Sequence, residues 1–174
     1  MFESENVKIM RKDTDITIGY SNVRICFLKN FVDLSSNLDW LHFNKKPEYF
    51  GNNLADDPLV AMGEMKVLRS KFKINGNENF NIGVFNIMIK EFDRIDSSKL
   101  NKLITELSDI KELEKYQRLI VLEEEQNEQY CYIRICVNPY DMHTGEVLTG
   151  KKKMINIVSE ISNIVRTNYL DIPE

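Results

Sequence analysis

The sequence predicts an α+β protein with a mainly antiparallel sheet of about five to seven strands, built from hairpins and covered by two or three helices. Three observations support this class. Residues 97–114 repeat apolar side chains at helical spacing, residues 130–137 alternate apolar and polar side chains, and Asn75-Gly76 is a tight-turn signal. Helices that separate antiparallel hairpins are typical of an α+β layer rather than of a parallel sheet.

The helix expected over 97–114 carries one apolar stripe. Its members are three or four positions apart: Leu100, Leu103, Ile104, Leu107 and Ile110. Residues 118–123 and 130–137 are then expected to pair as a hairpin. Side chains alternate along a strand, so one face of the second strand carries Cys131, Ile133, Ile135 and Val137. We expect this face and the helix stripe to form two halves of one core.

The N-terminal third is expected to add further strands. Residues 7–10 and 16–20 flank a polar turn and predict a short hairpin, and residues 23–28 predict another strand. Residues 31–43 are ambiguous, because Leu34, Leu38 and Leu41 could also line one side of a helix. Residues 44–58 contain Pro47, Gly51 and Pro58 and predict a loop.

A second hairpin is expected around Asn75-Gly76, between residues 59–74 and 80–92. In the return strand Ile82 and Val84 have one parity, while Phe85 and Ile87 have the other. This change predicts either a bulge or a strand that is buried on both faces. Residues 150–167 predict the last helix, with apolar residues that include Met154, Val158 and Ile161.

The bulk composition predicts one domain over residues 1–174. We divide it into N-terminal strands (1–28), a helix or loop region (29–58) and a hairpin–helix–hairpin–helix core (59–174). A chain of 174 residues with 43% hydrophobic content can bury a core without disulfides. Three cysteines without framework spacing favour a reducing compartment. No apolar run approaches the length of a membrane span, so a cytoplasmic location without membrane contact is expected.

Acidic residues are concentrated in one region. The net charge is −4, and residues 88–128 carry seven basic and eleven acidic side chains. An acidic excess disfavours direct nucleic-acid binding, which depends on the neutralisation of phosphates by Lys and Arg. It favours another protein as the partner, in particular a basic one, because complementary charge accelerates association. A homo-oligomer is also compatible with the sequence.

The hairpin supplies one group of candidate binding residues. Glu123, Glu124 and Glu125 lie at its tip, and Tyr130, Tyr132 and Arg134 share the strand face opposite Ile133. Aromatic and Arg side chains are enriched at protein interfaces. The alternative is that other elements of the chain cover this face.

Lys151, Lys152 and Lys153 form a second candidate group at the start of the last helix. Positive charge there opposes the helix dipole, so a binding partner could offset it. Exposed backbone N–H groups with three ammonium groups would bind an anion. The alternative is that Glu123–Glu125 pairs with these lysines within the chain.

An enzymatic alternative rests on Asp56, Asp57, Glu64 and Lys66. An acid followed by Glu-x-Lys on a strand resembles the pattern of metal-dependent nucleases, in which two carboxylates hold Mg²⁺ and the lysine assists the attack of water. His42 and His143 are the two histidines, and neither has metal-ligand spacing to Cys or acids. The main interpretation therefore includes no catalytic residue, metal or cofactor.

The expected order of helix, hairpin, helix, hairpin and helix over residues 31–167 resembles the small α+β fold of type III secretion chaperones. In size and acidity the chain also resembles toxin-immunity proteins. Both resemblances imply a non-catalytic protein that binds another protein as an inhibitor, immunity protein, chaperone or adaptor. The alternatives are a metal-dependent nuclease or hydrolase and a structural subunit of a larger complex.

Overall fold

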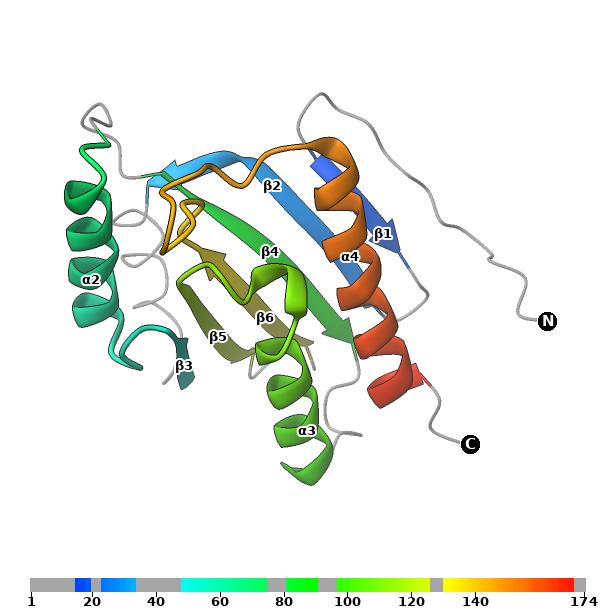
Figure 1. Cartoon of the computed structure of the whole chain (residues 1–174). Coiled ribbons are helices and arrows are strands. Elements are labelled where there is room, and N and C mark those ends of the chain that lie inside the picture. Colours follow the sequence, from blue (N-terminus) through cyan, green and yellow to red (C-terminus); the bar gives the residue numbers. More distant parts are fainter. Residues whose placement is uncertain are drawn as a thin grey trace.

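The computed structural model describes residues 15–19, 23–33, 48–74, 81–90, 97–125 and 130–170 (Figure 1). Side chains are described within 48–74, 83–87, 97–123, 132–150 and 152–168. The elements follow in the order β1 (Asp15–Gly19), β2 (Val23–Asp33), β3 (Glu48–Asn52), α2 (Pro58–Lys71), β4 (Asn81–Lys90), α3 (Ser97–Ser108), η2 (Lys111–Leu113), β5 (Arg118–Glu125), β6 (Tyr130–Val137), α4 (Lys151–Val165) and η3 (Arg166–Leu170).

The strands form one sheet in the spatial order β1-β2-β4-β6-β5-β3. Every neighbouring pair is antiparallel. The predicted α+β class with an antiparallel sheet is therefore confirmed. Figure 1 shows β3 at one edge of the sheet and β1 at the other, with α4 lying across β2 and β1.

The two faces of the sheet bury different clusters, and β5 shows this directly. Ile120 and Leu122 belong to the cluster that includes the apolar side chains of α3 and α4, whereas Leu119 and Val121 belong to the cluster beneath α2. Side chains of opposite parity on one strand point to opposite faces. The helices α3 and α4 therefore cover one face, and α2 covers part of the other.

The predicted hairpin of β5 and β6 and its core-facing side chains are confirmed. Ile133, Ile135 and Val137 of β6 are fully buried with the stripe of α3, while the side chain of Cys131 lies outside those that the structure describes. The helix predicted over 97–114 is also present, but α3 ends at Ser108 and a 3-10 turn follows. The buried guanidinium of Arg118 explains this boundary, because it donates to the carbonyl oxygens of Leu113 and, at 2.9 Å, Ser108.

The hairpin predicted between 59–74 and 80–92 is wrong. Residues 58–71 form α2, and β4 pairs with β2 and β6 instead. The buried positions of this helix are Pro58, Ala61, Met65 and Arg69. The return strand itself is confirmed as β4. Val84 and Phe85 are buried in opposite clusters, as expected for a strand covered on both faces.

In the N-terminal third the strand predicted over 23–28 is confirmed as part of β2, and the prediction is wrong over residues 48–52. The described partner of β1 is β2, and residues 7–10 lie outside the described residues. Residues 48–52, predicted as loop, form β3, and residues 31–33 end β2, while 34–47 lie outside the described residues.

Candidate functional site

Helix α2 is positioned by the short connector that joins it to β3. Asp57 caps the helix, because its Oδ1 accepts from the backbone N–H of Leu59 at 2.9 Å and of Val60 at 3.0 Å. Pro58 follows at the first helical position, where no donor is lost. The Glu64 Oε2 accepts from the N–H of Ala55 at 2.8 Å and so holds the connector against the helix.

The same connector protects the outer edge of β3. Asp56 Oδ1 accepts from the backbone N–H of Gly51 at 2.7 Å. A Cβ at Gly51 would lie 2.2 Å from the carbonyl oxygen of Leu54, so only glycine permits the chain to pass this closely. An edge strand with free donors invites pairing with another chain, and the Asp56 carboxylate occupies one of these donors.

The metal-site alternative expected Glu64 and Lys66 on a strand. This expectation is wrong, because both residues lie on α2. Residues two apart on a helix point in different directions. The carboxylates of Asp57 and Glu64 bind different backbone amides, which fix the connector. Among the described residues, no group of three or more His, Cys, Asp or Glu could hold a metal ion.

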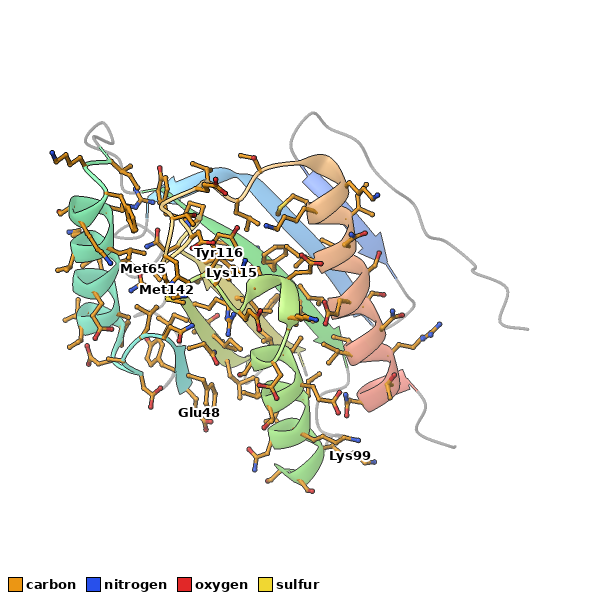
Figure 2. The ribbon with its side chains drawn as sticks, in the orientation of Figure 1. Glu48, Met65, Lys99, Lys115, Tyr116 and Met142 are labelled. Carbon is orange, nitrogen blue, oxygen red and sulfur yellow. The ribbon has the colours of Figure 1, made fainter. Side chains whose placement is uncertain are left out.

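The inner side of α2 packs on the sheet through apolar contacts and through polar contacts at its C-terminal end. Met65 is fully buried, and Figure 2 shows it between α2 and the sheet. At the C-terminal end, Arg69 Nε donates to Asn138 Oδ1 at 3.4 Å and its guanidinium lies 4.7 Å from the centre of the Tyr140 ring. Asn138 in turn donates to Gln117 Oε1 at 2.9 Å. Burial lowers the pKa of Arg69, and the electrostatic interaction with Tyr140 acts in the opposite direction.

The outer side of α2 exposes large apolar side chains. The exposed fractions are 60% for Leu59, 52% for Val60 and 70% for Val67. Val60 and Val67 are seven positions apart and lie on one line along the helix, with Gly63 between them. A Cβ at Gly63 would meet nothing within 4 Å. This stripe of Leu59, Val60, Gly63 and Val67 is hereafter called the α2 stripe.

The hairpin candidates are only partly at the surface. Glu123 and Arg134 form an ion pair beneath the surface, with side chains 2% and 8% exposed. Tyr132 lies beside this pair, its ring centre 5.4 Å from the guanidinium of Arg134. Arg134 and Glu123 are therefore covered by other parts of the chain, as the alternative for this face expected. Glu124, Glu125 and Tyr130 have side chains outside the described set.

The buried ion pair influences its neighbours. Burial, followed by the negative charges of Glu123 and Asp57, raises the pKa of Tyr49. Burial raises the pKa of the Cys136 thiol to about 12, with opposing contributions from Arg134 and Glu123. Cys136 is therefore a protonated core residue at neutral pH and not an activated nucleophile.

Lys152 and Lys153 at the start of α4 are not paired with Glu123, because the side chain of Glu123 lies on the α2 face of the sheet and α4 covers the opposite face. Lys153 instead donates to the hydroxyl of Tyr116 at 3.1 Å, and its ammonium lies 5.3 Å from the centre of that ring. Lys152 is exposed, and the side chain of Lys151 lies outside the described set.

Residues 97–116, which include α3 and η2, are balanced in charge, and the other seven acidic residues of 88–128 lie outside this span. Residues 97–116 carry four acidic and four basic side chains. The acidic side chains in this span are Glu106, Asp109, Glu112 and Glu114. Lys102 lies 3.7 Å from Glu106, and Figure 2 places Lys99 on the same helix and Lys115 just after η2.

The sequence interpretation missed the α2 stripe because it assigned these residues to a strand. One signal could have found it, since Asp57-Pro58 is an N-cap residue followed by proline at the first helical position.

No family model, curated protein or solved structure matches this chain. In the described part of the chain, no helix is long and apolar enough to cross a membrane.

Proposed function

We propose that this protein is a non-catalytic binding module that recognises another protein through the α2 stripe. The observation that carries the proposal is the exposure of Leu59, Val60 and Val67 on one helix. Single exposed apolar residues are ordinary, but neighbouring ones on one helix face form the kind of surface that helix partners bury.

The rest of the helix supports this role. The N-terminus is capped by Asp57, and the C-terminus is tied to the loop after β6 through Arg69 and Asn138. A helix held at both ends presents its outer side chains on a fixed backbone, which lowers the entropy lost on binding.

The experiment compares three tagged proteins purified from the native cells: the wild type, Val67→Glu and the control Ile155→Glu. Ile155 is an exposed apolar residue of α4, so the control adds the same charge to another helix. We expect a stoichiometric protein partner with the wild type and the control, and its loss with Val67→Glu. An untagged second copy of this chain counts as a partner. Recovery of no stoichiometric protein with the wild type, or equal recovery with Val67→Glu, would overturn the proposal.

A further inference from the structure

We infer that the partner of the α2 stripe is a second copy of this chain, which binds through an antiparallel α2–α2 contact about a two-fold axis. This inference rests on the proposed function and names its partner. It depends on two properties of α2, which are the placement of its exposed apolar residues and the placement of its charges.

The apolar residues of the stripe are self-complementary. In an antiparallel pair of identical helices, each residue meets the one placed symmetrically about the axis. The midpoint of Val60 and Val67 falls between Gly63 and Glu64. An axis at that point places Val60 of each copy against Val67 of the other, so both exposed valines of each helix become covered.

The charges of α2 have the same midpoint. Asp56 is exposed at the N-terminal end and Lys71 is exposed at the C-terminal end. Their midpoint also falls between Gly63 and Glu64. The register that joins the valines therefore brings the acidic end of each helix, Asp56 and Asp57, to the basic end of the other, Lys71 and Lys73. The two helix dipoles are then antiparallel as well.

The centre of the contact suits a close approach of two helices. Gly63 has no side chain, and the space around it is open. The Glu64 carboxylate accepts from the Ala55 N–H, which turns it back toward its own connector and away from the axis. Lys71 lies 5.3 Å from the centre of its own Phe72 ring and is still exposed to a partner.

The identity of the partner that binds the α2 stripe follows from this symmetry. A partner of another sequence would need apolar residues and opposite charges at matching places, whereas a second copy has them by construction. A single 14-residue helix offers a small contact area, so we expect weak association.

The first test measures the mass of the purified full chain in solution by sedimentation over a range of concentrations. We expect a concentration-dependent species of twice the 20.4 kDa mass of one chain. Val67→Glu should raise the dissociation constant at least about tenfold, which corresponds to 1.4 kcal/mol, while the control Ile155→Glu should leave it unchanged. A wild-type chain that stays monomeric at about 500 µM would overturn the inference. The proposed function would still stand if the native cells yield a different protein that Val67→Glu loses.

The second test distinguishes this geometry from other dimers. Val60→Cys and Val67→Cys are prepared separately, oxidised alone and oxidised as a mixture, with the wild type as the control for the native cysteines. The antiparallel register predicts a cross-linked dimer between the two variants in the mixture, and much less cross-linking in either variant alone. Equal or stronger cross-linking between identical variants would overturn this geometry.

Discussion

The two faces of this sheet are covered by different means. Under α3 and α4 the buried side chains form one large apolar cluster, which extends from Phe85 to Val165. Under α2 the apolar cluster is smaller, and it adjoins the buried ion pair of Glu123 and Arg134. Apolar burial is non-directional, whereas a buried charge requires one specific partner. The face under α2 therefore depends more on individual residues than the face under α3 and α4.

The helices on the two faces are also attached to the sheet by different contacts. Helix α4 buries Ile157, Val158 and Ile161 completely and is held by its apolar stripe. Helix α2 buries a narrower stripe and is fixed at its ends by the Asp57 cap and the Arg69–Asn138 contact. Because α2 needs few of its apolar residues for the sheet, Leu59, Val60 and Val67 are available for another role.

The largest expected effect comes from breaking the ion pair on the α2 face. Arg134→Met leaves the Glu123 carboxylate buried without its cation, and we expect a loss of about 3–5 kcal/mol in the free energy of unfolding. Urea denaturation measures this loss. The double variant Glu123→Leu/Arg134→Met should recover most of it, since no unpaired charge is then buried.

The matched control is an ion pair at the surface. Lys102 lies 3.7 Å from Glu106, with side chains 64% and 35% exposed. Lys102→Met should cost only about 0.3–0.5 kcal/mol, because water screens this pair. A cost for Arg134→Met as small as that of Lys102→Met would contradict the difference between the two faces.

The face under α3 and α4 could be predicted from the sequence, and the face under α2 could not. Leu103 and Leu107 repeat with one clear helical period, and Ile133 and Ile135 alternate with one clear strand period. Residues 59–68 instead carry apolar side chains in every direction, as shown by buried Met65 and exposed Val67. Periodicity then cannot decide between helix and strand, and the cap at Asp57-Pro58 was the better signal.

The burial of two candidate binding residues, Glu123 and Arg134, could not be read from the sequence for a related reason. Glu123 and Arg134 are charged, and charge alone suggests the surface. Their pairing depends on the register of β5 and β6, in which Glu123 lies opposite Tyr132 and Arg134 opposite Val121. Diagonal neighbours on one face of a sheet are within reach of long side chains. The sequence alone supplies both residues but not the strand register that brings them together.

A smaller effect of opposite sign is expected at Gly63 on the outer side of α2. Glycine within a helix is less favourable than alanine by about 0.5–1 kcal/mol, and the space for a Cβ is open. Gly63→Ala should therefore raise the thermal midpoint of the monomer by about 1–4 °C. The control Gly51→Ala should lower it, because its Cβ would meet the Leu54 carbonyl at 2.2 Å. A lower midpoint for Gly63→Ala in dilute solution would show that this position is not free in the monomer.

A further small effect is expected at Asp141, in the loop after β6. Asn138 binds Gln117 and Arg69 toward α2, while the Met142 N–H donates to the Lys115 carbonyl after η2 at 2.9 Å. Asp141 shapes this loop, because its Oδ1 accepts from the backbone N–H of His143 at 2.7 Å and of Thr144 at 3.1 Å. Burial acts to raise the pKa of Asp141, but these two donors and the charges of Lys115 and His143 outweigh it, and the pKa is lowered.

A carboxyl with a lowered pKa in the folded state contributes stability above its unfolded pKa and loses it as the pH falls through the folded value. Asp141→Asn keeps an acceptor but removes the charge, so we expect a loss of about 0.5 kcal/mol at neutral pH. Urea denaturation from pH 7 to pH 3 should show the difference between wild type and variant shrinking below about pH 4, the ordinary Asp pKa. A difference that stays constant over this range would mean that the charge of Asp141 does not stabilise the loop and that the shape of its hydrogen bonds is sufficient.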